Sequence, residues 1–174
     1  MRRRVIQGVM KNGMKLRFYE VKAHSCIREH KLLEGVTIMS YDIELCDPIS
    51  HETLELDFSH QMRGGTYAMN GTKEAWLNIT YNYADWYYKP NVFPDKKGIR
   101  SIYGLSGAES IPVLENAIRT LETMEEDLSQ EEIEEHEKHG ATGYWMPTRV
   151  NAIKPLYQLL AMARMRPDGV WKGD

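Results

Sequence analysis

A run of aromatic residues at positions 76–88 constrains the fold of this chain more than any other stretch. The run holds two of the four tryptophans and four of the ten tyrosines, interleaved with asparagine, threonine and aspartate. Side chains with an aromatic body and a polar tip suit positions that are apolar at one end and wet at the other. We therefore expect the run to form the wall of a core that opens into a pocket.

Length and composition place the chain among globular proteins. It has 174 residues, 42% of them hydrophobic and 27% charged, and a chain of this size buries roughly 70% of the surface that its unfolded form exposes. Cys26 and Cys46 lack the spacing of a metal site, which predicts free thiols in a reducing compartment. The apolar runs are shorter than the roughly 18 residues that span a membrane, and the N-terminus lacks the apolar stretch of a signal peptide. The sequence thus predicts a cytosolic protein without membrane contact.

Charge is distributed unevenly along the chain, although the formal net charge is only -3. Residues 1–31 carry nine Lys or Arg against two Glu, and residues 122–138 carry nine acids against one Lys. A basic arm favours nucleic acid or an acidic partner. Mutual attraction of the two segments, or two solvated segments of opposite charge, explains the same pattern. Nucleic-acid binding through residues 1–38 is therefore kept as an alternative function.

A change of pattern at Met39 divides the chain into an N-terminal extension, residues 1–38, and a single domain, residues 39–174. Within the extension, the sequence predicts two weak strands, Val5–Met10 and Lys15–Val21, on either side of a turn at residues 11–13. The codons just before Met39 can spell a purine-rich ribosome-binding sequence, so Met39 is a candidate alternative start.

Alternation of polar and apolar residues predicts an antiparallel sheet in the domain. Residues 40–46 and 53–57 alternate on either side of a turn, which predicts a hairpin. Residues 66–69 and 74–80 predict a second hairpin, and residues 170–174 a short strand at the sheet edge.

Two main helices and one polar helix complete the predicted fold. Ser106 and Glu109 have capping-box spacing, but Pro112 favours a helix that begins at Ser110. Thr148 is the expected cap of the last helix, and residues 122–139 predict a solvated helical extension. The fold class is α+β: an antiparallel sheet of about four strands covered on one face by two main helices, plus the polar helical extension.

The candidate ligand-binding residues come from the aromatic run and its neighbours. Trp76, Asn78, Thr80 and Asn82 share one face if the strand stays regular, and aromatic platforms with amide groups suit a nucleobase. An arginine beside Gly64-Gly65 could hold a phosphate, although the glycines fit a tight loop equally well. The predicted ligand-binding set is Arg63, Trp76, Asn78, Thr80, Asn82, Asp85, Trp86 and Arg100. The sequence predicts no catalytic residue, metal or cofactor.

An enzyme acting on a nucleotide-type substrate is the alternative. His60 and Asp85 provide an acid/base pair on paper, but neither has the spacing of a known motif.

Five segments of the domain resemble a family of small proteins encoded by tailed bacteriophages and prophages. These segments are MSYDIEL at 39–45, MRGGTYA at 62–68, EAWLNITYNY at 74–83, GAESIP at 107–112 and MRPDGVW at 165–171. The resemblance implies a phage origin and a location in the host cytoplasm, and it brings no activity with it.

The expected function is that of a phage accessory protein that binds without catalysis. Its partner would be a nucleotide-like small molecule or a host protein, and such binding could counter host defence. Association with a second copy of the chain stays open.

Overall fold

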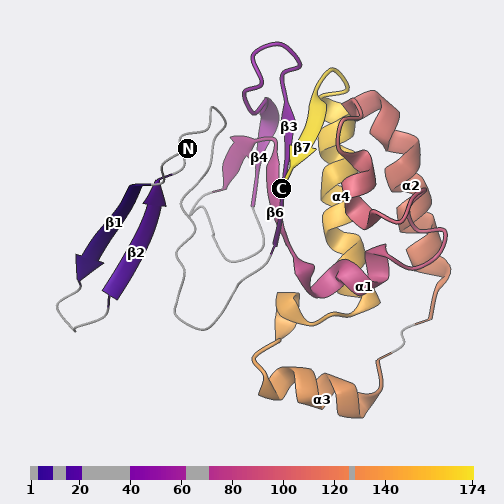
Figure 1. Ribbon diagram of the computed structural model, residues 1–174. Helices are drawn as coiled ribbons and strands as arrows, with labels where there is room; N and C mark the ends of the chain where they lie inside the picture. The colour runs from indigo at the N-terminus through magenta and orange to yellow at the C-terminus, as the bar shows by residue number, and fades with distance from the viewer. Residues whose placement is uncertain (1–3, 10–14, 21–39, 62–70, 126–127) are drawn as a thin grey trace. The chain divides into compact units, whose positions relative to one another are not determined.

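The computed structural model describes residues 4–9, 15–20, 40–61, 71–125 and 128–174, in two compact units, Met1–Lys31 and Leu32–Asp174. The first unit contains strands β1 (Arg4–Val9) and β2 (Lys15–Glu20), which pair antiparallel (Figure 1). The sequence predicts strands at both places.

A three-stranded antiparallel sheet forms the centre of the second unit. Its order is β6 (Trp76–Thr80), β3 (Ser40–Cys46) and β7 (Val170–Gly173), so β3 is the middle strand. The predicted C-terminal edge strand is therefore confirmed. The outer edge of β7 is itself covered, because the Trp171 amide donates to the carbonyl of Leu105 and the Gly104 amide donates to the carbonyl of Trp171, both at 2.9 Å.

Alternation along the strands gives the sheet two different faces. Residues paired directly across neighbouring strands point to the same face, and the register pairs Ile43 with Leu77 and Asp42 with Asn78. The apolar face is buried and consists of Tyr41, Ile43, Leu45, Leu77, Ile79 and Trp171. The polar face consists of Ser40, Asp42, Glu44, Trp76, Asn78, Thr80 and Lys172.

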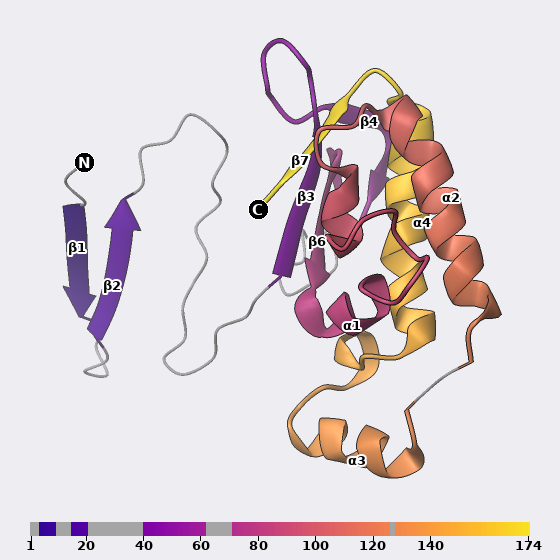
Figure 2. The ribbon, with the colours of Figure 1, turned by 45° about the vertical axis from the view of Figure 1, so that its right-hand side comes forward.

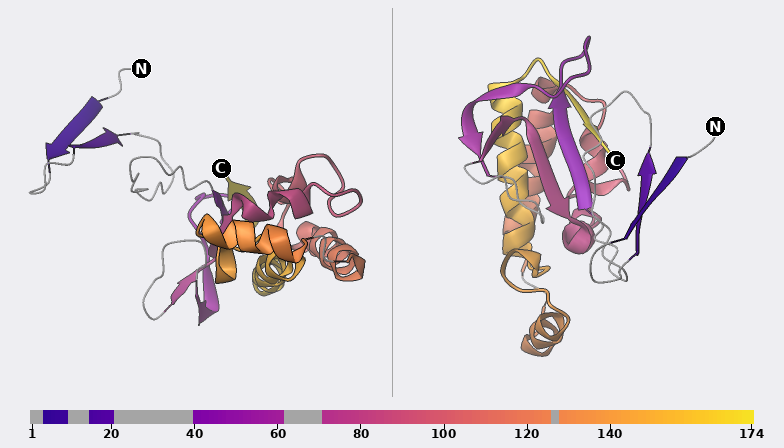
Figure 3. Two further views of the ribbon diagram at one scale, coloured as in Figure 1. Left: turned by 90° about the horizontal axis from the view of Figure 1, so that it is seen from below. Right: turned by 90° about the vertical axis from the view of Figure 1, so that its left-hand side faces the viewer.

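The helices α2 (Gly107–Thr123) and α4 (Arg149–Met165) lie side by side on the apolar face (Figure 2). Leu114 and Leu121 of α2 and Leu156 and Leu159 of α4 are completely buried, and each such side chain contributes about 1.5–3 kcal/mol through burial. When the left-hand side of Figure 1 faces the viewer, the strands β3 and β6 lie in front of both helices (Figure 3, right). The α+β class predicted from the sequence is thus confirmed.

The helix α2 begins at Gly107, so the predicted start at Ser110 is wrong. Ser106 is the N-cap: its hydroxyl accepts from the Glu109 amide at 3.2 Å, and the Glu109 carboxylate accepts from the Ser106 amide at 2.8 Å. Amide groups at the start of a helix need acceptors outside it, and a turn before β7 supplies two more. The Gly107 amide donates to the carbonyl of Gly169 at 2.7 Å, and the Ala108 amide donates to that of Pro167 at 3.1 Å. These acceptors offset the helical hydrogen bond that Pro112 lacks.

The other two helix predictions agree with the structure. Thr148 caps α4, because its hydroxyl accepts from the Asn151 amide at 3.3 Å. The helix α3 (Gln130–Lys138) begins with a capping box formed by Ser129 and Glu132, and none of its side chains is buried. It is the predicted polar extension.

The predicted hairpin between residues 40–46 and 53–57 is wrong beyond its first pairs. Cys46 bridges to Thr53 and the Leu54 amide donates to the carbonyl of Leu45, but the next strand, β4 (Glu55–His60), pairs with β5 (Thr72–Glu74). The reason is Ala75: its carbonyl accepts from the Leu45 amide at 2.8 Å and its amide donates to the carbonyl of Leu54 at 2.7 Å. Ala75 thereby splits the predicted strand 74–80 into β5 and β6. The predicted strand 66–69 lies outside the described residues.

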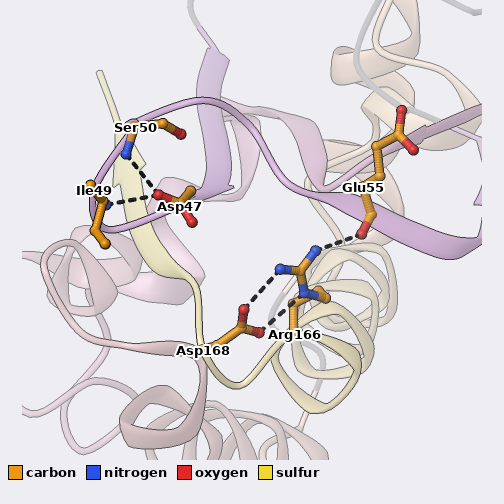
Figure 4. Close-up of polar contacts among 6 residues, drawn as sticks. All are labelled: Asp47, Ile49, Ser50, Glu55, Arg166 and Asp168. Carbon is orange, nitrogen blue, oxygen red and sulfur yellow. Dashed lines mark hydrogen bonds and ion pairs between the residues drawn. The ribbon is translucent and has the colours of Figure 1, made fainter.

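The turn between α4 and β7 is fixed to the start of β4 by an arginine. Arg166 forms a two-point ion pair with Asp168, with donor–acceptor distances of 3.1 and 2.8 Å, and also donates to the carbonyl of Glu55 at 3.0 Å (Figure 4). In the neighbouring loop the Asp47 carboxylate accepts from the amides of Ile49 and Ser50 at 2.8 and 2.7 Å (Figure 4). The bonds of Arg166 hold the turn that caps α2 in place, and those of Asp47 order its own loop.

Candidate functional site

Several segments of the chain meet at one end of the sheet. Both neighbours of β3 run antiparallel to it, so β6 ends beside Ser40 at the start of β3 and β7 ends beside Ile43. The helix α1 (Ala84–Tyr87) and the 3₁₀ turns η1 (Tyr81–Tyr83) and η2 (Gly98–Ile102) follow directly after β6 and its loop. The side chains gathered there define the Arg100 cluster: Tyr41, Tyr81, Tyr88, Arg100, Tyr103 and Asp174.

The guanidinium of Arg100 is the centre of this cluster. It lies 4.8 Å from the ring centre of Tyr41 and 5.3 Å from that of Tyr81, distances at which an arginine is attracted to an aromatic face. Its Nη2 donates to the Tyr81 hydroxyl at 2.5 Å and its Nε to the main-chain carbonyl of Asp174 at 3.1 Å. A guanidinium carries more N–H donors than these two bonds use. Arg100 is half-buried, so the remaining donors form an anchored fork that a ligand anion could approach.

Tyr88 provides an aromatic surface next to that fork. Its ring packs against Gly98, which has a positive φ of 59° and where an added Cβ would lie 3.3 Å from Cε1 of the ring. A backbone that approaches this closely supports the ring from one side, yet Tyr88 remains 48% exposed. Its hydroxyl is an electrostatic neighbour of the Tyr41 hydroxyl and of the Arg100 guanidinium. The ring is therefore fixed in place and still open to solvent, as a stacking surface must be.

Three tyrosines of the cluster, Tyr41, Tyr81 and Tyr103, stay protonated over the physiological pH range because their pKa values are raised. Burial raises the pKa of Tyr41 and of Tyr103, and the neighbouring phenols or the Asp174 carboxylate raise them further. Burial also raises the pKa of Tyr81, with a further contribution from Asp174. The hydroxyl of Tyr103 is buried and has no hydrogen-bond partner among the described residues. Neutral phenols keep their O–H donors, which suits them to contact a negatively charged group.

A chain of hydrogen bonds connects the predicted residue Asn78 with the predicted residue Arg100. The Asn78 amide donates to the Asp42 carboxylate at 2.5 Å and to the Ser40 hydroxyl at 2.7 Å. The Asp42 amide donates to the Asp174 carboxylate at 3.3 Å, which also accepts from the Tyr81 hydroxyl at 3.1 Å. Asn78 itself is only 2% exposed. Asn78 therefore orients the Asp42 carboxylate from a buried position. The part of the network that solvent can reach is at Arg100.

The other predicted residues of the aromatic run contact the protein itself. Asn82 leaves the strand, because β6 ends at Thr80 and Thr80 accepts from the Asn82 amide at 3.2 Å as the cap of η1. The prediction that Asn82 continues the face of Asn78 is thus wrong. The Asn82 side chain donates to the carbonyl of Trp145 at 2.7 Å, and Trp86 donates to that of Pro147 at 2.8 Å.

Two tyrosines of the run have the same role. Tyr83 donates to the carbonyl of Tyr144, and the completely buried Tyr87 donates to that of Ala152 at 2.8 Å. The polar tips at positions 82–87 therefore fasten the run to residues 144–152, the approach to α4 and its first turn. This satisfies their need for a polar partner without a pocket.

The remaining predicted residues are Trp76, Asp85 and Arg63. Trp76 is half-buried on the polar face of the sheet. Asp85 is exposed on α1. Arg63 lies outside the described residues.

The acid/base alternative has no matching geometry. The Nε2 of His60 lies 2.7 Å from the carbonyl of Glu74, and no hydrogen bond joins His60 to Asp85. Within the described ranges, no group of three or more His, Cys, Asp or Glu side chains is arranged to hold a metal ion. Among the described helices, none combines the length and the hydropathy of a membrane span.

Comparisons with protein-family models, with curated protein sequences and with solved structures return no match for this chain.

The predicted ligand-binding set contains Arg100 and Asn78 of this network and leaves out the other members of the cluster, Tyr41, Tyr81, Tyr88, Tyr103 and Asp174. Tyr88 had a readable signal, since it ends the aromatic run directly before a lysine and a proline, where a helix stops and a side chain tends to stay exposed. Asp174 had none, because it is 74 residues from Arg100 and only the pairing of β7 with β3 brings it there.

Proposed function

We propose that this chain is an accessory protein of a tailed phage or prophage that acts in the host cytoplasm by binding a nucleotide-like small molecule without catalysis. The observation that carries the ligand class is the pair formed by Tyr88 and Arg100: a supported, half-exposed ring beside an anchored guanidinium. Stacking on an aromatic ring accepts any nucleobase, and an arginine fork suits a phosphate. The phage origin rests on the sequence resemblance alone.

In the proposed binding mode, Tyr88 binds the base and Arg100 binds the phosphate. The base would lie on the open side of the Tyr88 ring, and the phosphate would accept from the N–H groups of Arg100 that Tyr81 and Asp174 leave unused. Stacking contributes about 1–3 kcal/mol per base, and charge-assisted hydrogen bonds about 1.5–3 kcal/mol. For an accessory protein, such binding would remove a host nucleotide signal and so counter host defence.

Calorimetry with the monophosphates AMP, GMP, CMP and UMP tests the proposal. We expect saturable heats with the wild-type chain, and a loss of affinity of roughly tenfold or more in Tyr88→Ala, as expected for one lost base–ring stack. Tyr157→Ala is the matched control, because Tyr157 is equally exposed at 49% but lies on α4 and donates to Glu122. Absent heats with all four nucleotides, or equal losses in the two variants, would overturn the proposed function.

A host protein as the partner is the second candidate. It is favoured by exposed apolar side chains away from the cluster, Ile49 at 87% and Phe58 at 74%. A pull-down from infected cells, with Phe58→Ser as the comparison, tests it: a captured host protein should be lost in the variant.

A further inference from the structure

The charges around Arg100 also limit how many negative charges a nucleotide ligand can carry. The Arg100 cluster contains one guanidinium, and the Asp174 carboxylate lies within it, bonded to the Tyr81 hydroxyl that also accepts from Arg100. The main-chain amide of Asp42 donates to the Asp174 carboxylate, and the carboxylate of Asp42 accepts from Asn78. A ligand phosphate on Arg100 therefore approaches one cation that already belongs to a bonded network with two carboxylates.

Two lysines of the described chain that lie close in sequence to Tyr88 and Arg100 are already engaged. Lys97 lies 3.6 Å from the Asp95 carboxylate, which also accepts from the Ser101 hydroxyl and the Lys97 amide. The ammonium of Lys89 lies over the ring of Trp86, 4.4 Å from its centre. Neither side chain is directed to Arg100 by these contacts, so neither of these two lysines offers a second or third phosphate the match that Arg100 offers the first.

We infer that the Arg100 cluster selects nucleotides of low negative charge, a single phosphodiester or monophosphate, and rejects nucleoside polyphosphates. The inference rests on the proposed function. Arg100 neutralises one phosphate charge, and each further charge is repelled by Asp174 and Asp42 while it loses its own water. A site governed by the charge of Arg100 alone would show the opposite order, because Coulomb attraction to a cation rises with ligand charge. The order of affinities is therefore diagnostic.

A series of ligands with one base and rising charge tests this inference: 3′,5′-cyclic AMP, AMP and ATP, each titrated into the full chain by calorimetry at fixed ionic strength. We expect ATP to bind roughly tenfold more weakly than AMP, as Coulomb repulsion over a few ångströms in a partly solvated site predicts. In Asp174→Asn this difference should shrink to about threefold or less. Asp57→Asn is the matched control: it removes the same charge from an exposed position on β4 and should leave the difference unchanged.

The outcomes separate the two proposals. If none of the three nucleotides binds, the proposed function itself fails. If all three bind and affinity rises from cyclic AMP to ATP, the ligand class stands and the inference about charge is overturned. If ATP binds more weakly but Asp174→Asn keeps the full difference, the assignment of the selectivity to Asp174 is wrong. A reduced difference in Asp174→Asn alone supports the inference.

Discussion

Replacing Gly107 by alanine tests how α2 is fixed to the turn before β7. Gly-to-Ala changes inside helices normally stabilise a protein by up to about 1 kcal/mol, because glycine has the poorer helix propensity. Here a Cβ at residue 107 would lie 2.4 Å from the carbonyl oxygen of Arg166 and 3.0 Å from Cα of Pro167. Both are backbone atoms, so no side chain can move aside to make room.

The expected loss in free energy of unfolding follows from the contacts between α2 and the turn that the added methyl group disturbs. To admit the methyl group, α2 and the turn must separate, which weakens the bonds from the Gly107 amide to Gly169 and from the Ala108 amide to Pro167. Each such hydrogen bond contributes about 1 kcal/mol, and overpacking costs about 1–3 kcal/mol. We therefore expect Gly107→Ala to lower the free energy of unfolding by about 2–3 kcal/mol, which corresponds to a decrease in Tm of about 4–12 °C.

Urea unfolding followed by tryptophan fluorescence measures this change, since Trp171 is buried in the sheet next to the turn. Ala108→Gly is the control: Ala108 is exposed on the first turn of α2 and should lose no more than about 1 kcal/mol, through propensity alone. A Gly107→Ala variant as stable as the wild type or more stable would refute the close approach of helix and turn.

Further changes test other contacts. Tyr87→Phe should lower the free energy of unfolding by about 1 kcal/mol, because the carbonyl of Ala152 loses its phenol donor at a fully buried position; an unchanged urea midpoint would contradict this. Ser110→Ala should cost about 1–3 kcal/mol, because the buried Trp171 Nε1 loses its acceptor, 2.7 Å away, and the same titration measures it. Burial lowers the pKa of His60, so the unfolded chain takes up that proton first as the pH falls below about 6.5. The free energy of unfolding should therefore decrease from about pH 6.5 downwards through the lowered pKa, and this decrease should be smaller in His60→Gln.

Local chemistry made much of the fold predictable. The period of two in residues 40–46 gives β3 with the expected bounds, because a half-buried strand needs alternate side chains on two faces. The cap at Thr148 and the capping box at Ser129 mark where α4 and α3 begin. Each of these signals lies within a few residues of the structure that it specifies.

The errors arose where a distant segment decided the outcome. Pro112 made Ser110 the better local start for α2, but the carbonyls of Pro167 and Gly169 satisfy the earlier amides. Ala75 joins Leu45 and Leu54 and so replaces a simple hairpin by two separate pairings. Neither contact has a signature in the neighbouring sequence.

In the candidate site, too, the residue types could be predicted from the local sequence, but the contacts between distant segments could not. The residue types in the aromatic run suggested a wall with polar tips, and the tips are present, but those at positions 82–87 bond to residues 144–152. The Arg100 cluster depends on β7 lying beside β3, a pairing over more than a hundred residues of sequence. Its tyrosines could be recognised as aromatic from the sequence, but their convergence on one guanidinium could not.

The most direct test of ligand binding at the Arg100 cluster is an NMR titration that observes the arginine Nε–H signals of the full chain while AMP is added. If the phosphate binds at this guanidinium, the Arg100 signal, assigned by its loss in Arg100→Lys, should shift saturably, and adenosine without a phosphate should shift it far less. An Arg100 signal that stays fixed while AMP saturates the protein, or that moves equally with adenosine, would contradict the proposed binding mode.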